Sequence, residues 1–373
     1  MTIIASIIAA SLAAPQSAPA APAQPAAPAP TPPAAIPAAA ALPASAAPVA
    51  DVRGTAGIPM LVAPDARPDL IINGLVFAEG PTADSAGQTY YTDLSSSTVY
   101  RVVLGKRGYE AERILDDSNG CLGLEFARSG RLYSAQYNTG RIVELQLTEG
   151  GKALPRGVVE SYGGEARPCV NDLVATADGG IWFTNTGDPR RATRRGIYFT
   201  TEAGAEPVQF TPAIQRPNGI ALSPDEKTLY VADAGAPLVW SFPVEGPGKL
   251  GEGRPFANVS VVGDPARVKG ADGIAVDVLG NLWVAVPMAS AVVVIDPQGQ
   301  PLGRVMLPEY PSNCAFGGAD GRLLFITART GVYLLPTIVE GHWTAKGGAP
   351  ARRVADPAAP VAPAPPVSPP AQK

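Results

Sequence analysis

Short apolar runs recur along this chain, each preceded by a turn rich in Gly, Asp or Asn. In residues 167–185, for example, the turn TADGG leads directly into the apolar run IWF. Runs of this length, bounded by turn residues, predict β-strands, and segments with a helical period of useful length are absent. The pattern therefore predicts an all-β chain.

Six segments of the chain align with one another. Each begins with a mostly polar residue and carries a turn residue eight positions later, which is Gly in five units and Glu226 in the fourth. The first residues, at 79, 122, 171, 218, 272 and 313, are 43, 49, 47, 54 and 41 residues apart. A repeat of this length with several short strands is typical of a β-propeller, whereas a solenoid would need shorter repeats and caps. We therefore predict a six-bladed β-propeller with a central channel.

The ends of the chain differ from this repeating part. Residues 21–51 and 351–373 are rich in Ala and Pro and predict a disordered linker and a disordered tail, which leaves 52–350 for the propeller. The strand-like DLIIN at 69–73 precedes the first unit, and we expect it to pair into the last unit and close the ring. Residues 1–20 resemble a secretory signal peptide without the usual Lys or Arg. We expect export to the periplasm or the medium; if the leader is not a signal, the protein stays in the cytoplasm.

Charge and rare residues narrow the function. The 373-residue chain has a net charge of −4, which argues against nucleic acid as a partner, and its apolar leader is too short to span a membrane. The single histidine, His342, disfavours His-dependent catalysis and is expected at the surface or on an edge strand. Cys121, Cys169 and Cys314 form no CxxC and are expected to be small buried packing residues. The oligomeric state stays open.

The first residue of each unit carries the candidate chemistry. In a propeller the innermost strands line the channel, so these six positions converge, and five of them carry side-chain oxygens: Glu79, Asn171, Asn218, Asp272 and Asn313, with Leu122 as the exception. Converging carboxylates and amides suit a hard divalent cation, with Ca²⁺ favoured and Mg²⁺, Mn²⁺ or Zn²⁺ as alternatives. The other interpretation is that these residues cap turns at the strand ends.

The pair Asn171-Asp172 adds one further prediction. Because neighbouring residues of a strand face opposite sides, Asn171 should point into the channel and Asp172 away from it. Asp172 would then serve the scaffold, and its substitution would mainly reduce stability.

Five motifs in this order resemble one protein family: FAEGP (77–81), VNDLVATADGGIWFTN (170–185), RPNGIALSPDEKTLYVAD (216–233), ADGIAVDVLGNLWVA (271–285) and SNCAFGG (312–318). Over residues 70–335 the chain resembles the SMP-30/gluconolactonase family of six-bladed propeller lactonases. The resemblance implies one channel metal, usually calcium, bound by Glu79, Asn218 and Asp272, with Asn171 contacting metal or substrate. It also implies that Asp272 is the general base.

Some positions depart from the family pattern. Leu122 stands where many relatives have Asn, and Cys169 occupies a variable position that shapes substrate contacts. The loop DPRRATRR (188–195) is expected at the channel mouth, where Asp188 and Arg190 would contact substrate; the alternative is a solvated charged loop. These departures bear on the substrate more than on the metal.

The expected function is therefore metal-dependent hydrolysis of a small-molecule lactone, with a sugar lactone opened to an aldonic acid as the reference reaction. The alternatives are a non-catalytic, calcium-stabilised binding propeller and a related propeller esterase or phosphotriesterase.

Overall fold

The computed structural model describes residues 50–51, 58–162, 169–188, 195–210, 213–262, 268 and 270–357. All of the described residues lie in the unit from Ala41 to Lys373. The predicted signal peptide and all but the last two residues of the predicted linker lie outside the described residues.

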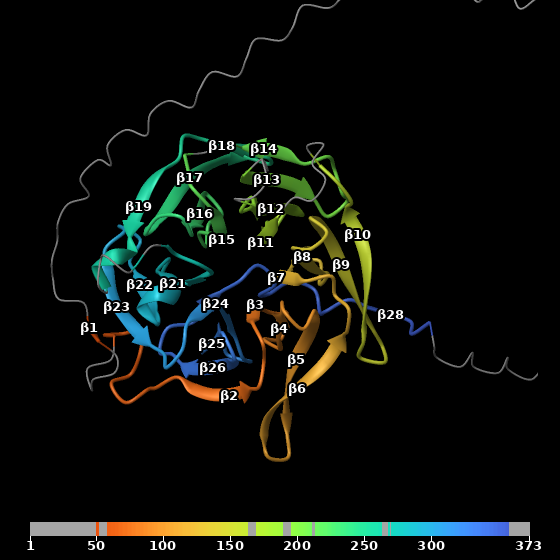
Figure 1. The fold of residues 1–373 in the computed structure, drawn as a ribbon, viewed down its shortest axis with the longest axis horizontal. Helices are drawn as coiled ribbons and strands as arrows, with labels where there is room; N and C mark the ends of the chain where they lie inside the picture. Colours follow the sequence, from red (N-terminus) through yellow and green to blue (C-terminus); the bar gives the residue numbers. More distant parts are fainter. Residues whose placement is uncertain are drawn as a thin grey trace, which may run out of the picture. The chain divides into compact units, whose positions relative to one another are not determined.

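Six antiparallel sheets surround a central axis, as the sequence repeats predict (Figure 1). Blade 1 comprises β3 (Ala78–Ala83), β4 (Thr89–Asp93), β5 (Thr98–Gly105) and β6 (Gly108–Leu115). Blade 2 comprises β7 (Cys121–Phe126), β8 (Leu132–Gln136), β9 (Arg141–Thr148) and β10 (Ala153–Val159). Blade 3 comprises β11 (Val170–Ala175), β12 (Gly180–Asn185), β13 (Gly196–Thr201) and β14 (Val208–Phe210).

The second half of the ring repeats this order with small additions. Blade 4 comprises β15 (Pro217–Leu222), β16 (Thr228–Asp233), β17 (Leu238–Gly246), β18 (Lys249–Leu250) and β19 (Arg254–Asn258), followed by the 3-10 helix η1 (Val259–Val262). Blade 5 comprises β20 (Ile274–Asp277), β21 (Leu282–Val286), the 3-10 helix η2 (Pro287–Ala289), β22 (Ala291–Ile295) and β23 (Pro301–Met306). Blade 6 comprises β24 (Pro311–Gly317), β25 (Leu323–Ala328), β26 (Gly331–Pro336) and β2 (Asp69–Asn73).

The position of β2 confirms the predicted ring closure. This strand precedes blade 1 in sequence but pairs antiparallel with β26 of blade 6, from Asp69 opposite Leu334 to Asn73 opposite Gly331. The last blade is thus completed by the N-terminal side of the propeller, which covers an edge that would otherwise be open.

The turn residues of the repeat share one backbone conformation. The five turn glycines have φ between 71° and 90°, and Glu226 adopts the same left-handed region with φ of 55°. This conformation costs a residue with a side chain about 1 kcal/mol. Both carboxylate oxygens of Glu226 accept the Ala177 N–H of the neighbouring blade, at 3.0 and 3.1 Å, and these bonds offset the cost.

The hydrophobic core lies between the blades. Each of the six pairs of adjacent blades encloses one cluster of buried apolar side chains. Between blades 5 and 6, for example, the rings of Trp283 and Phe316 meet edge to face with centroids 5.5 Å apart. Because the packing is between sheets, the inner strands are held firmly around the channel.

The C-terminal segment crosses one end of the channel. Its short strand β27 (Gly341–His342) pairs with β20, the indole Nε1 of Trp343 donates to the Asp84 carbonyl at 3.2 Å, and Thr344 Oγ1 donates to the Ala175 carbonyl at 2.9 Å. These contacts join blades 5, 1 and 3. No helix among the described residues is long and apolar enough to cross a bilayer.

Two strands extend beyond the boundaries that composition predicts. Ala50–Asp51 (β1) pair in parallel with β23, and Arg353–Val354 (β28) pair in parallel with β9. Composition places these residues in the linker and the tail because they offer little to bury. An open sheet edge, however, pairs with backbone groups whatever the side chains are, so composition alone does not predict such contacts.

Candidate functional site

The inner strands carry a β-bulge at the end of the channel opposite the C-terminal segment. In blade 3, Val170 pairs with Asn185 and Leu173 with Phe183, so Asn171 and Asp172 together face the single residue Thr184. The pairings of β7 and β15 shift in the same way, at Leu122 and at Asn218. A bulge interrupts the alternation of side chains along a strand.

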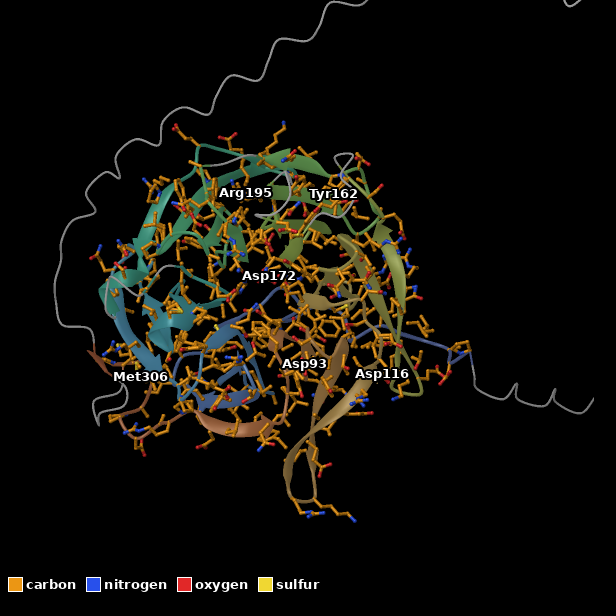
Figure 2. The ribbon with its side chains drawn as sticks, viewed as in Figure 1. Asp93, Asp116, Tyr162, Asp172, Arg195 and Met306 are labelled. Carbon is orange, nitrogen blue, oxygen red and sulfur yellow. The ribbon has the colours of Figure 1, made fainter. Side chains whose placement is uncertain are left out.

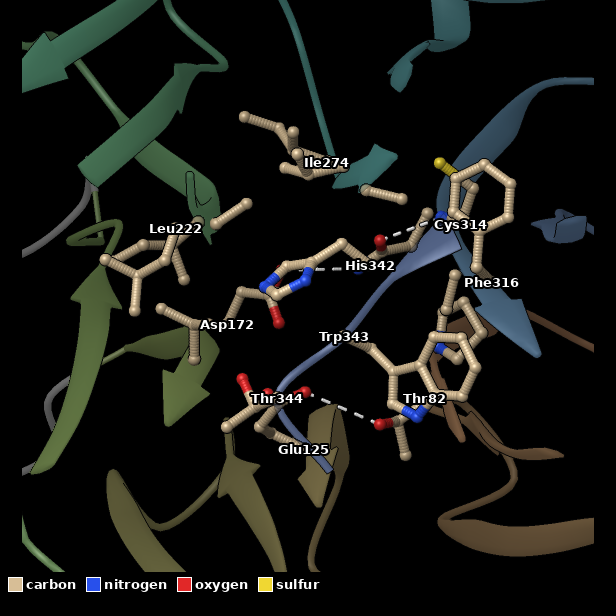
Figure 3. A pocket seen from close by; sticks show the side chains of 18 of the residues that line it. Thr82, Glu125, Asp172, Leu222, Ile274, Cys314, Phe316, His342, Trp343 and Thr344 are labelled. Atoms are coloured by element: carbon tan, nitrogen blue, oxygen red, sulfur yellow. Dashed lines mark hydrogen bonds between the residues drawn. The ribbon is translucent and has the colours of Figure 1, made fainter. Parts of the chain in front are cut away.

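The bulge overturns the predicted orientation of Asp172. Its carboxylate Oδ2 accepts a hydrogen bond from Asn313 Nδ2 at 3.3 Å, across the channel from blade 6, and Asp172 lines the channel cavity (Figures 2 and 3). The side chain is only 7% exposed. The prediction that Asp172 faces away from the channel was therefore wrong, because it assumed a regular strand.

Glycine occupies the second bulge position in the other blades where the neighbouring blade approaches closely. A Cβ at Gly123 would collide with Asp172 Oδ1, and one at Gly273 would collide with Asn313 Oδ1. Asp172 and Asn313 thus supply the side chains at this level of the channel.

Strand pairing also shifts Asn313 relative to the predicted alignment. Pro311 pairs with Ala328, the last residue of β25, as Val170 pairs with Asn185, the last residue of β12. Counted from these pairs, Asn313 corresponds to Asp172 and not to Asn171. The spacing from the turn glycine misaligned it because β24 has seven residues where β11 has six.

Three of the four predicted ligands meet at the bulge level. An amide–carboxylate hydrogen bond joins Asn218 to Asp272, and the charges of Glu79 and Asp272 act on each other. The Glu79 carboxylate accepts the backbone N–H of Gly80 at 3.0 Å, and it is also hydrogen-bonded to the Asn313 side chain. Asn171 takes the same bulge position in β11 that Asn218 takes in β15.

The pKa values of the carboxyl groups at the bulge level are raised, which favours their neutral forms. Burial, and then the charge of Asp272, raise the pKa of Glu79 well above its usual value. Burial and the charge of Asp172 raise the pKa of Asp272 to about 7, although Arg216 and Asn218 act in the opposite direction. Burial also raises the pKa of Asp172 to about 6. The site therefore gathers carboxyl groups whose ionised form a bound cation would stabilise.

The donor set fits a hard cation that takes amide as well as carboxylate oxygens. Within the described ranges, no group of three or more His, Cys, Asp or Glu side chains is arranged to hold a metal ion. The bulge ring instead offers two carboxylates, Glu79 and Asp272, and the amides of Asn171 and Asn218. Mixed oxygen ligation of this kind suits Ca²⁺ or Mg²⁺ better than zinc.

The predicted substrate residues are placed only in part. Burial, and then the neighbouring Cys169, raise the pKa of Tyr137, which follows β8, and the charge of Asp188 adds to this shift, so Asp188 lies near that phenol. Arg190 lies outside the described residues, as does most of the loop DPRRATRR.

Below the bulge ring the channel continues as a cavity of about 70 Å³, room for a few water molecules. Glu125 lines it, hydrogen-bonded to Thr82 Oγ1 at 3.5 Å and to the Thr344 side chain, and burial raises its pKa to about 8. His342 lies on the edge strand β27, as expected, but it lines the cavity and not the outer surface (Figure 3). Sequence reasoning missed Glu125, whose only signal is a charged residue inside the apolar run LGLEF.

The three cysteines agree with their prediction. All are buried, and none forms a disulfide. Burial raises the pKa of Cys121 to about 11 and that of Cys314 to about 12, so neither thiol is a ready nucleophile.

Residues 77–330, more than half of the chain, match the family model described as the SMP-30/gluconolactonase/LRE-like region. This chain belongs to the SMP-30/gluconolactonase family. Within the family it is similar to a gluconolactonase of Zymomonas mobilis, with 27% identity over 58% of this chain and 63% of that protein, less than two thirds of its length. It is also similar to the lactonase drp35 of Staphylococcus aureus, with 25% identity over 62% of this chain and 69% of that protein.

A solved structure supports the same membership. A gluconolactonase from Xanthomonas campestris has 29% identity and a TM-score of 0.62, over 73% of this chain and 90% of that chain. The family match begins at Phe77 in FAEGP and spans all six inner strands, but it leaves out β2 and β26, which close the ring.

Proposed function

We propose that this family member is a metal-dependent lactonase, which opens a cyclic ester by hydrolysis. The observation that carries the proposal is the buried ring of Glu79, Asn218 and Asp272 at one end of the channel, in a chain whose relatives are named gluconolactonase and lactonase. Those names put a sugar lactone, opened to its aldonic acid, first among the substrates to assay.

Glu79, Asn171, Asn218 and Asp272 would hold one divalent ion. Calcium is favoured by the hard oxygen donors, with Mg²⁺, Mn²⁺ or Zn²⁺ as alternatives. When bound, the ion supplies positive charge that stabilises the oxyanion formed from the ester carbonyl.

Asp272 is the proposed general base. Its carboxylate is hydrogen-bonded to the Asn218 amide, which fixes its orientation at the ring. Asp272 accepts a proton as the oxygen of water bonds to the carbonyl carbon. The ring C–O bond then breaks, and the departing alkoxide takes the proton from Asp272. Water and lactone thus become one hydroxy acid, and Asp272 is regenerated.

The test is to follow acid release from δ- and γ-lactones with the full-length protein at constant pH. Activity should disappear in EDTA and return when Ca²⁺, Mg²⁺, Mn²⁺ or Zn²⁺ is added. Full activity in EDTA would contradict the metal assignment. A folded, calcium-binding protein that opens no lactone would contradict the enzyme assignment and favour the binding propeller.

A further inference from the structure

One blade interrupts the polar ring with an apolar side chain. Leu122 takes in β7 the bulge position that Asn218 takes in β15, and it is 4% exposed. Its strand neighbours Cys121 and Leu124 belong to the cluster between blades 1 and 2, whereas Leu122 belongs to none of the six clusters between blades. Leu122 therefore places a buried apolar side chain at the level of the ring, outside the six clusters between blades.

The rim above the ring is built on one repeated hydrogen bond. The residue after the second strand of a blade donates its N–H to the carbonyl of a residue just before the inner strand. The donor and acceptor pairs are Leu94 to Phe77, Tyr137 to Gly120, Thr186 to Cys169, Ala234 to Arg216 and Arg329 to Tyr310, at 2.9–3.1 Å. These residues therefore occupy equivalent places around the mouth of the channel.

Blades 6, 1 and 2 carry large aromatic side chains on this rim, next to the exposed Arg329, and we call this part of the rim the aromatic sector. Phe77 and Tyr137 are each 36% exposed, and Tyr310 is 50% exposed. Phe77 and Tyr310 lie on either side of Arg329. The Arg329 N–H donates to the Tyr310 carbonyl, and the Arg329 carbonyl accepts the N–H of Ala78, the residue after Phe77, both at 3.1 Å. Large apolar side chains that remain exposed beside a site mark the surface where a ligand binds.

Blades 3 and 4 form the opposite, polar sector. Cys169 and Asp188 lie within electrostatic reach of Tyr137, and Arg216 lies within reach of both Tyr137 and Asp272. The mouth thus has an aromatic sector and a polar sector, and the charge of Arg216 in the polar sector acts on Asp272.

We propose that the preferred substrate is a lactone with an alkyl or aryl substituent, which lies against Leu122, Phe77 and Tyr310, and not a fully hydroxylated sugar lactone. The inference rests on the proposed function. Hydroxyl groups placed against Leu122 would lose their hydrogen bonds to water without replacement, whereas each buried methylene should raise kcat/KM about fourfold.

The first experiment compares kcat/KM for δ-valerolactone, 5-alkyl δ-lactones of increasing chain length and glucono-δ-lactone, with the activating metal present. We expect kcat/KM to rise over the first few methylenes and to be lowest for the sugar lactone. A flat series in which glucono-δ-lactone is fastest would overturn this inference and leave the lactonase function standing. Turnover of no lactone at all would overturn the proposed function and this inference with it.

Variants then test which residues cause the preference for alkyl-substituted lactones. Leu122→Asn keeps the number and branching of the side-chain heavy atoms and should shift the ratio of sugar-lactone to alkyl-lactone kcat/KM at least tenfold toward the sugar. Tyr310→Ala, at the exposed rim, should reduce the dependence on chain length without changing the fold. Val208→Ala, equally exposed but on the outermost strand of blade 3, is the matched control and should change neither value. Unchanged ratios in both Leu122→Asn and Tyr310→Ala would overturn the assignment.

Discussion

Replacing Glu125 by Gln should change how the stability of the propeller depends on pH. This side chain lies in the interior cavity of the channel, hydrogen-bonded to Thr82 and Thr344 and repelled by the charge of Asp172. Burial favours its neutral form, so the folded protein holds a proton that the unfolded chain releases at much lower pH. Glutamine keeps the size and the hydrogen bonding of the neutral acid.

The magnitude follows from the two pKa values. Burial raises the pKa of Glu125 to about 8, against an ordinary value of 4.5. Because the folded state binds the proton more tightly, the free energy of unfolding is highest below pH 4.5, falls as the pH rises, and levels off above pH 8. Between pH 5 and pH 9 this one group should lower the free energy of unfolding by about 4 kcal/mol. Glu125→Gln abolishes that loss.

The assay is urea unfolding followed by tryptophan fluorescence at pH 5 and pH 9, with EDTA present so that no divalent ion changes the field in the channel. The free energy of unfolding of Glu125→Gln, relative to that of the wild type, should increase as the pH rises. Glu206→Gln, in an exposed loop, removes the same charge from the surface and should leave the pH dependence unchanged. If wild type and Glu125→Gln lose stability in parallel, the carboxyl is ionised in the folded protein and the reasoning fails.

Three further predictions test other parts of the molecule. Asp272→Asn should lower kcat for lactone opening at least about 100-fold while the near-UV circular dichroism stays native; a fully active variant would exclude Asp272 as the base. Asp172→Asn removes a charge that raises the pKa of Asp272, so the acidic limb of the kcat/KM profile should move to lower pH. An acidic limb at the same pH as in the wild type would mean that the charge of Asp172 does not affect the general base. Asp277→Ala should lower the free energy of unfolding by about 3 kcal/mol, because it leaves the Trp283 indole and the Leu279 and Asn281 N–H groups without their acceptor. A change within error in urea midpoint would mean that other acceptors replace the carboxylate.

Much of the candidate site follows from local signals. The six units each carry their own turn residue and apolar strand, so their number and order could be counted before any contact was known. The same count placed Glu79, Asn218 and Asp272 at one end of one channel, where burial and mutual charge now act on them. The spare strand at 69–73 could be matched to the last blade because a closed ring leaves no place for an open edge.

Other features depend on how strands pair across a blade. The direction of Asp172 follows from the bulge opposite Thr184, and the level of Asn313 follows from the additional residue in β24. Neither bulge has a residue pattern of its own, since Asn-Asp and Ser-Asn are equally compatible with a regular strand. Glu125 and His342 share a cavity only because the C-terminal segment crosses the end of the channel.

The sequence by itself thus determined the number of blades, the closure of the ring and the chemistry of the bulge ring, because periodic spacing repeats the same local environment six times. Tertiary structure alone decided which neighbours face the channel, which carboxyl groups have raised pKa values and which sector of the mouth is aromatic. Those properties depend on register, burial and the packing of one blade against the next, and these are set by contacts between residues that are far apart along the chain.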